Sequence, residues 1–213
     1  MRKLPAIYLQ KIMKSLLTSN INSARFWDTQ YSPRRRKGYI ESNEKYIKYD
    51  YVLETIKDEE KILDMGCGLG IMGVKIKEKY PLCDVWAFDF SSVVIDYLRV
   101  DPLYIHFLDA KIGEEDVPDD FDVVTCLDVI EHMDDATVAF KDAFKHLKVG
   151  GRLIVTTPDG DTRPYAASPE HMWLFDHEDI DKFYTDAGFE KPEYLYLPGR
   201  EGVLFITAVG KKL

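Results

Sequence analysis

A chain of 213 residues with 46% apolar content is long enough for one globular domain with a substantial core. The net charge of −9 argues against a general affinity for nucleic acid, and three widely spaced cysteines indicate neither a disulfide framework nor a zinc cluster. The sequence has no apolar run near the about 18 residues of a membrane span and no secretory signal, so we expect a cytoplasmic protein.

The first 50 residues are basic, whereas the remainder is strongly acidic. Residues 4–17 place their apolar side chains on one helical face. Residues 32–38, SPRRRKG, interrupt this periodicity and indicate a loop, and residues 41–57 predict a helix before the first strand. We therefore expect a basic helical segment over residues 1–50 and a separate domain over 51–213.

A glycine-rich stretch, KILDMGCGLGIMG at 61–73, follows a short strand pattern and opens a helix. Read as GxGxxG through Gly68, Gly70 and Gly73, with Asp89 downstream, it fits a dinucleotide site. Asp64 favours a different ligand, because a carboxylate at the strand end would repel a pyrophosphate. It would attract the ammonium and sulfonium groups of S-adenosylmethionine.

Strand and helix patterns alternate after residue 61, which predicts a parallel sheet with helices on both faces. We expect strands at 85–88, 105–108, 121–127 and 152–156, and the main helices at 72–80, 134–147 and from 176 to 187. The last two strand patterns, 193–197 and 203–209, are separated only by residues 198–202. That link is too short for a crossover, so we expect an antiparallel hairpin.

The pattern D-x-G-C-G-x-G, from Asp64 to Gly70, resembles the first motif of class I S-adenosylmethionine-dependent methyltransferases. The resemblance implies an α/β, Rossmann-like seven-stranded sheet with a C-terminal antiparallel hairpin. It also implies that the N-terminal aromatic segment forms a lid over the cofactor. The residues expected to bind the cofactor are Asp64, Gly66, Cys67, Gly68, Gly70, Asp89, Phe90, Asp109, Ala110 and Leu127.

Acidic residues end three successive strand patterns and can each receive part of such a cofactor. Asp64 suits the amino group, and Asp89 can accept hydrogen bonds from both ribose hydroxyls. Phe90 can lie against the adenine ring, and Asp109, followed by Ala110, can accept from the adenine amino group. Dinucleotide dehydrogenases do not end in an antiparallel hairpin, which further favours S-adenosylmethionine.

The stretch LDVIEHM, after the fourth strand pattern, resembles the E-x-x-E-H element of ubiquinone-biosynthesis O-methyltransferases and Hen-type small-RNA 2′-O-methyltransferases. The resemblance implies a divalent metal, Mg, Mn or Zn, held by Asp128, Glu131, His132 and His171. Asp128 departs from the family pattern, which has Glu there. A metal-free site would instead use His132 or His171 as a general base, and a third interpretation makes Glu131 and His132 ordinary loop residues.

We expect methyl transfer to a hydroxyl of a small molecule or glycan, with His132, Glu131 and His171 as catalytic residues. The sequence shows none of the motifs of amino-methylating or cytosine-C5-methylating DNA enzymes. An RNA 2′-O-methyltransferase is the alternative, supported by the basic run at 34–37, although nucleic acid is otherwise an unexpected partner. A cofactor-binding partner subunit without activity is a second alternative. The acceptor and the oligomeric state are not encoded in any motif.

Overall fold

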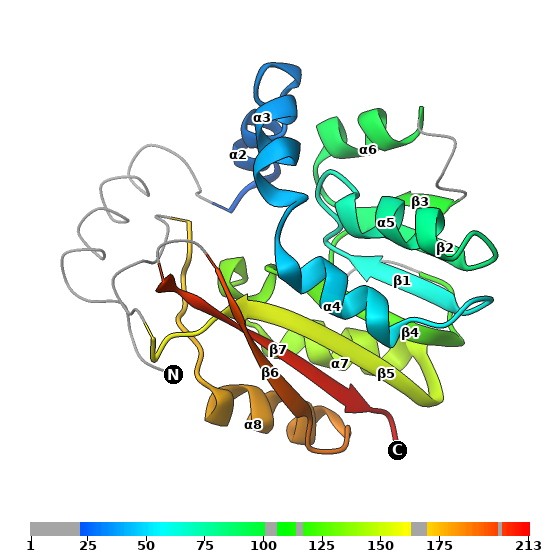
Figure 1. The fold of residues 1–213 in the computed structure, drawn as a ribbon, viewed down its shortest axis with the longest axis vertical. Coiled ribbons are helices and arrows are strands. Elements are labelled where there is room, and N and C mark those ends of the chain that lie inside the picture. Colours follow the sequence, from blue (N-terminus) through cyan, green and yellow to red (C-terminus); the bar gives the residue numbers. More distant parts are fainter. Residues whose placement is uncertain (1–21, 101–105, 114–116, 163–169, 200–201) are drawn as a thin grey trace.

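A computed structural model describes residues 22–100, 106–113, 117–162, 170–199 and 202–213. Within these residues the strands form one seven-stranded sheet in the order β3-β2-β1-β4-β5-β7-β6 (Figure 1). The strands are β1 Lys61–Met65, β2 Asp84–Asp89, β3 His106–Asp109, β4 Phe121–Leu127, β5 Leu147–Pro158, β6 Glu193–Pro198 and β7 Leu204–Lys211.

Strands β1 to β5 pair in parallel, and β7 lies antiparallel between β5 and β6. The chain reverses direction along the sheet after β3 and continues on the other side of β1. The carboxyl ends of β1 and β4 therefore meet at a switch point, where ligands bind in open α/β sheets. The expected mixed sheet with a C-terminal antiparallel hairpin is confirmed.

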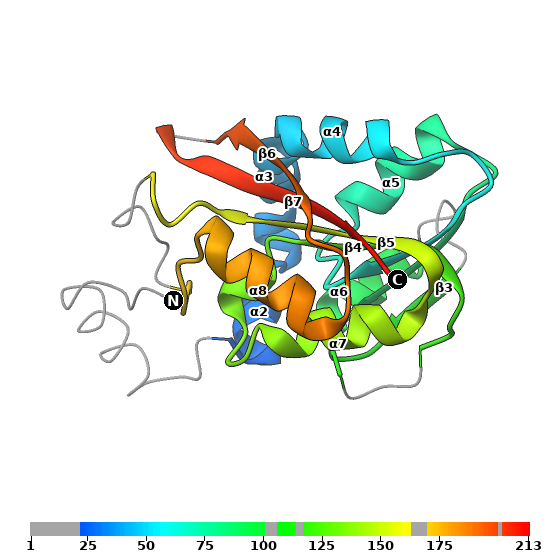
Figure 2. The same ribbon diagram turned by 90° about the horizontal axis from the view of Figure 1, so that it is seen from below.

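Helices cover both faces of the sheet, with α4 and α5 on one side and α7 and α8 on the other (Figure 2). The helices are α2 Ala24–Gln30, α3 Pro33–Asn43, α4 Ile47–Thr55, α5 Ile71–Lys79, α6 Ser92–Leu98, the short 3-10 helix η1 Ile130–His132, α7 Thr137–His146 and α8 His177–Ala187. No described helix has the length and apolar character needed to cross a membrane.

Tyr184 of α8 is fully buried and joins the helix to two strands. Its hydroxyl is 3.0 Å from the Leu153 carbonyl and 2.9 Å from the Ala208 carbonyl, on adjacent β5 and β7. A Cβ on Gly210 would lie 2.5 Å from the Tyr184 ring, so the glycine makes room for it. The expected caps of α8 are also present, since Asp176 accepts from the Asp179 amide at 3.0 Å and Gly188 ends the helix with φ 99°.

The N-terminal segment differs from expectation. Residues 32–38 are not a loop: Ser32 precedes α3, and Pro33 occupies its first position. Proline lacks the N–H that a first turn does not need, so it starts this helix rather than breaking it. The helix expected over 41–57 is divided, because α3 ends at Asn43 and α4 begins at Ile47. The helix expected at 4–17 lies outside the described residues.

Candidate functional site

Two cavities lie at the carboxyl ends of the central strands. The larger has a volume of about 460 Å³, and the smaller of about 60 Å³. Gly66, Tyr31 and Asp128 line both of them. The two spaces therefore adjoin, and an elongated ligand can extend from one into the other.

The glycine loop between β1 and α5 lies against the end of β2. The Gly66 and Cys67 amides donate to the Phe88 carbonyl at 2.9 and 3.0 Å. Gly66 has φ 67°, and a Cβ there would lie 2.9 Å from Val129, so this position requires glycine. Gly70 precedes the first residue of α5, which directs the helix N-terminus toward the loop.

Asp64 lines the smaller cavity and is 2% exposed. Its Oδ1 accepts from the Thr125 hydroxyl at 2.7 Å, and its Oδ2 has no partner among the described residues. Burial raises the pKa of Asp64 to about 6, against the effect of the Thr125 hydrogen bond. Cys67, Gly68 and Leu127 also line this cavity, so these expected cofactor residues are brought together.

Asp89 ends β2 and lines the larger cavity. Its Oδ2 accepts from the Gly68 amide at 3.0 Å and its Oδ1 from the Ser91 amide at 2.9 Å. Burial raises the pKa of Asp89 to about 6, and these amide hydrogen bonds oppose the change. The carboxylate therefore holds the glycine loop in place, a second role that the sequence did not indicate.

Phe90 and Ala110 line the larger cavity as expected, but Asp109 lies outside both cavities. Asp109 pairs with Asp89 in the parallel register, yet its side chain is exposed because β3 is an edge strand of the described sheet. The hydrogen bond that Asp109 was expected to accept from an adenine amino group therefore has no support in the lining of either cavity. Lys111, Ile112 and Gly113 follow Ala110 along the cavity wall.

Aromatic side chains from the N-terminal helices complete the cavity walls. Tyr31 and Tyr39 contact edge to face at 5.3 Å, and Tyr31 stacks with Trp27 at 5.6 Å. A Cβ on Gly68 would lie 3.2 Å from the Tyr31 hydroxyl, so this ring sits directly over the glycine loop. Residues 22–43 therefore cover the ends of β1 and β2.

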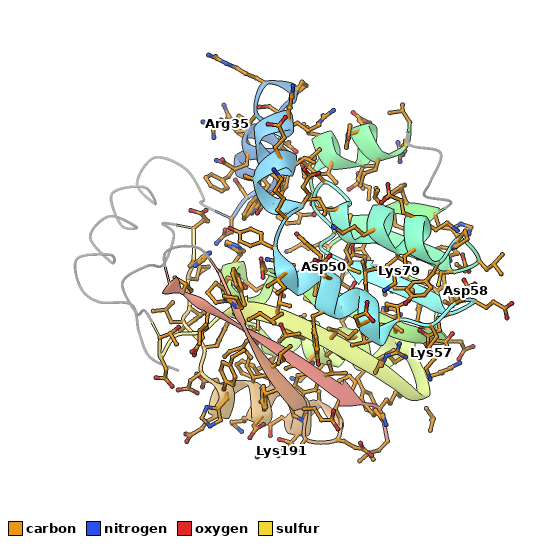
Figure 3. The ribbon with its side chains drawn as sticks, viewed as in Figure 1. Arg35, Asp50, Lys57, Asp58, Lys79 and Lys191 are labelled. Atoms are coloured by element: carbon orange, nitrogen blue, oxygen red, sulfur yellow. The ribbon has the colours of Figure 1, made fainter. Side chains whose placement is uncertain are left out.

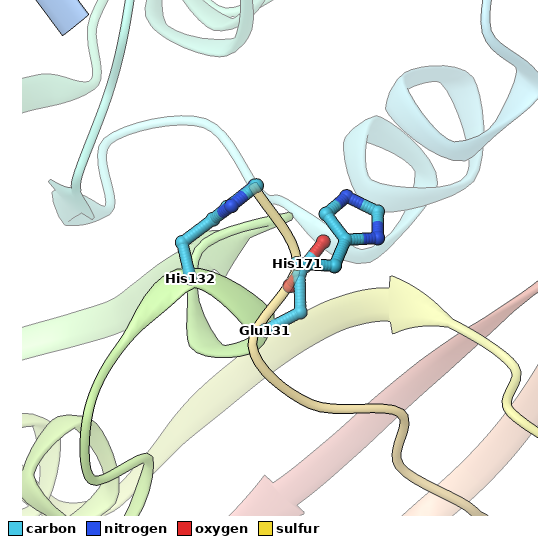
Figure 4. A group of neighbouring side chains, drawn as sticks. All are labelled: Glu131, His132 and His171. Atoms are coloured by element: carbon cyan, nitrogen blue, oxygen red, sulfur yellow. The ribbon is translucent and has the colours of Figure 1, made fainter. Parts of the chain in front are cut away.

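Glu131, His132 and His171 lie close together (Figure 4), and His132 lines the larger cavity. Glu131 and His132 lie on η1, just after β4, and His171 comes from the segment before α8. The Glu131 carbonyl accepts from the Met172 amide at 2.8 Å, which holds that segment against η1. One ligand atom from each of the three residues lies within 4.8 Å of the others.

Hydrogen bonding and burial define the charge states of this group. The His132 Nδ1 is 3.0 Å from the Glu170 carbonyl and therefore carries the proton, so Nε2 has a free lone pair. Burial lowers the pKa of His132, lowers the pKa of His171 to about 3, and raises the pKa of Glu131 to about 7. Both imidazoles are neutral near pH 7.

Two buried atoms in the group have no hydrogen-bond partner among the described residues: Glu131 Oε1 and His171 Nδ1. The other carboxylate oxygen, Glu131 Oε2, accepts from the Thr157 hydroxyl at 3.1 Å. Unpaired buried polar atoms are costly, so these two atoms are candidate contacts for a further group. A carboxylate and two imidazoles are suitable ligands for a divalent cation.

Asp128 does not join this group, contrary to the expected metal set. It follows β4 with φ 56°, and its Oδ1 accepts from the Thr156 hydroxyl at 2.7 Å. Its Oδ2 forms an ion pair with the ammonium of Lys48, on α4. Burial lowers the pKa of Lys48 to about 7, and the Glu131 carboxyl acts in the opposite direction.

Lys48 and Tyr31 were not predicted as site residues. Lys48 has a recognisable signal, because it shares the buried side of α4 with Val52, four residues later. A lysine at a core-facing helical position requires an anionic partner, which here is the partly exposed Asp128. Tyr31 belongs to the N-terminal aromatic segment that the resemblance places over the cofactor, but its residue type alone does not distinguish it, since aromatic residues are common in cores.

Comparison with known proteins identifies a family that this chain matches. A family model described as a methyltransferase domain matches residues 39–193. The chain is 27% identical over 166 residues to phosphoethanolamine N-methyltransferase 3 of Arabidopsis thaliana, covering 72% of this chain and 33% of that protein. It is 29% identical over 119 residues to the ubiquinone biosynthesis O-methyltransferase of Pseudomonas fluorescens, covering 50% of this chain and 47% of that one.

The fold also resembles solved structures. One is the 1,6-didemethyltoxoflavin-N1-methyltransferase of Burkholderia thailandensis, crystallised with 1,6-didemethyltoxoflavin and S-adenosylhomocysteine. The TM-score is 0.72 at 16% identity, over 89% of this chain and 86% of that one. The two curated relatives are much longer than their matched parts, since this chain spans half of their length or less.

Proposed function

The chain belongs to the methyltransferase domain family, and on this basis we propose that it transfers the methyl group of S-adenosylmethionine to a hydroxyl of a small molecule or glycan. The observation that carries the proposal is the pair of adjoining cavities, with Asp64 and Asp89 in their walls and Glu131, His132 and His171 at their side. The carboxylates suit the cofactor, and the second group suits removal of the acceptor proton.

The cofactor is expected to bind with its methionine end in the smaller cavity and its adenosine in the larger. Asp64 would accept from the ammonium group, and Asp89 from the ribose hydroxyls. Phe90 and Ala110 would contact the adenine from the wall of the larger cavity. This arrangement leaves His132, which lines the same cavity, near the methyl group.

Residues 22–50 are proposed to act as part of a lid. Support comes from Trp27 and Tyr31, which line the larger cavity, and from Tyr39, which lines the smaller one. A closed aromatic cover excludes water from the reacting groups and strengthens their electrostatic interactions. The expected boundary at residue 50 falls within α4, which packs against α5, so we propose that the lid itself ends before α4.

His132 is proposed as the general base. Its Nδ1–H faces the Glu170 carbonyl, which leaves Nε2 free to accept a proton from the acceptor hydroxyl. The ring lies edge to face against Trp27 at 4.9 Å and against His171 at 4.8 Å, which fixes its orientation. The carboxylate of Glu131 would stabilise the imidazolium that forms.

The same residues also fit a divalent cation of magnesium, manganese or zinc. Glu131 and His171 offer the two buried atoms without partners in the described structure, and His132 offers Nε2. A bound cation would supply Lewis acidity that lowers the pKa of the acceptor hydroxyl. In either case Glu131, His132 and His171 hold the acceptor oxygen beside the cofactor.

The acceptor class is tested by incubating the purified protein with S-adenosylmethionine and three panels: hydroxylated small molecules and glycans, amines, and RNA. Release of S-adenosylhomocysteine with a hydroxylated acceptor is expected. Activity on the amine panel alone would contradict oxygen as the target, and is the result that similarity to a phosphoethanolamine N-methyltransferase would favour. Cofactor binding without any acceptor would favour a partner subunit.

Metal use is tested in the same assay with a chelator. If activity is lost and returns on adding one cation, the three residues act as ligands. If activity is unchanged by the chelator, His132 acts as a general base without a metal.

The RNA alternative depends on the basic run of α3, where Arg35 lies at the outer end of the N-terminal helices, away from the sheet (Figure 3). RNA binding through this run would weaken steeply with salt and would be lost when residues 34–37 are neutralised. We expect neither effect, because the run lines neither cavity.

Cofactor affinity is expected to fall in acid. Asp64 and Asp89 have pKa values raised to about 6 in the free protein, and both must be ionised to accept from the cofactor. Binding therefore releases protons below that pH, and affinity should decrease by up to about tenfold per pH unit for each carboxyl. Calorimetry from about pH 5 to about pH 8 in two buffers measures both quantities. A flat profile without proton release would contradict the assignment.

A further inference from the structure

Lys48 is a buried cation without a place in the proposed chemistry. It is 1% exposed and lines neither cavity. Its ammonium lies 4.8, 5.4 and 4.4 Å from the ring centres of Tyr46, Tyr49 and Phe205. Aromatic faces stabilise a cation without adding a second anion, so the site is built to keep a lysine here.

The anion paired with Lys48 faces the ligand space. Asp128 lines both cavities and its side chain remains 29% exposed, whereas that of Lys48 is 2% exposed. Asp128 is also held at φ 56° by its amide, which donates to the Thr156 carbonyl at 2.9 Å. The carboxylate therefore stands between the lysine and any bound cofactor.

The carboxyl groups near the expected cofactor position affect the barrier to methyl transfer through their negative charge. Asp64 and Asp128 place two carboxyl groups in the wall of the cavity expected to hold the methionine end of the cofactor, and Glu131 lies beside His132, which lines the larger cavity. In methyl transfer the carbon–sulfur bond breaks, a carbon–oxygen bond forms, and sulfur keeps the electron pair. The positive charge on sulfur is lost as the acceptor proton leaves to the base. Carboxylates that stabilise the sulfonium too strongly therefore raise the barrier, because the transition state has less of that charge.

We propose that Lys48 is the internal counter-cation of the methyl-transfer site: by pairing with Asp128 it limits how strongly the site's carboxylates favour the sulfonium cofactor over its neutral product. It is a positioning residue, since it acts through Asp128. The inference rests on the proposed cofactor placement.

The test is the ratio of dissociation constants for S-adenosylhomocysteine and S-adenosylmethionine, measured calorimetrically at about pH 6.5, which is below the lowered pKa of Lys48. Lys48→Met should raise this ratio about tenfold, because a nearby positive charge is removed. Lys48→Arg keeps the charge and should stay near the wild-type ratio. Asp128→Asn should shift the ratio in the opposite direction, and the double substitution should return it toward the wild type.

The control is Lys45→Met, which removes an exposed lysine three positions away and should leave the ratio unchanged. Equal weakening of both ligands by Lys48→Met would mean a purely structural role and would overturn the inference. If Lys48→Met does not fold, the Asp128→Asn variant tests the inference instead. A lower ratio of dissociation constants supports the inference, and an unchanged ratio rejects it. Failure of the wild type to bind either ligand would instead reject the proposed function.

Discussion

Replacing Asp89 with alanine should weaken S-adenosylhomocysteine binding by about 100-fold or more. The substitution removes the acceptor for both ribose hydroxyls, and hydrogen bonds to a charged group contribute about 1.5–3 kcal/mol each. It also releases the Gly68 and Ser91 amides, which the carboxylate holds at 3.0 and 2.9 Å. The glycine loop then lacks the hydrogen bonds that hold it in place. Part of the binding free energy is therefore spent on ordering the loop. Isothermal titration calorimetry measures the change directly.

Asp96→Ala is the matched control, since Asp96 is exposed on α6 and lines neither cavity. It should bind as tightly as the wild type. A melting temperature for each variant separates loss of folding from loss of affinity. Unchanged affinity in a folded Asp89→Ala protein would contradict the placement of the ribose. Titration with NADH provides the remaining comparison, and we expect no binding because Asp64 would face the pyrophosphate.

Replacing His132 with alanine should lower turnover by about 10²–10⁴-fold while cofactor affinity changes little. The lost group is the base proposed for the acceptor proton, and the cofactor is held mainly by other residues. Glu131→Gln should also reduce turnover, by a smaller factor, since it keeps the shape but removes the carboxylate that stabilises the imidazolium. Production of S-adenosylhomocysteine from the acceptor found in the panel screen measures both.

His177→Ala serves as the control, because His177 is exposed at the start of α8. Its turnover should equal that of the wild type. A His132→Ala protein that keeps full turnover would remove His132 from the mechanism. Weakening of cofactor binding and turnover by the same factor would indicate a binding role instead.

The sheet was predictable because its signals are local. Alternating strand and helix patterns, strand-ending acids and the short link at 198–202 each restrict the chain to a few topologies. The confirmed β7 and β6 pairing follows from that link alone, since it is too short for a crossover. The glycine loop and Asp64 likewise act through their immediate neighbours in sequence.

Residues 32–38 show where local reasoning failed. Proline and a basic run suggested a loop, yet Pro33 starts α3, because its effect depends on the turn it occupies. Asp109 is a different case: it ends its strand as expected, but β3 is an edge of the described sheet, the side chain is exposed, and it lines neither cavity. Strand position in the sheet is not encoded in the strand itself.

The sequence by itself determined the fold class, the glycine loop after β1 and the carboxylates at the ends of β1 and β2, because each depends on residues close together in the chain. Only the tertiary structure decided which distant groups meet. It separated Asp128 from the expected metal ligands and paired it with Lys48, 80 positions earlier. It also brought His171 to Glu131 and His132. Such pairings are fixed by packing across the whole sheet, and buried charges are stable only where that packing supplies a partner.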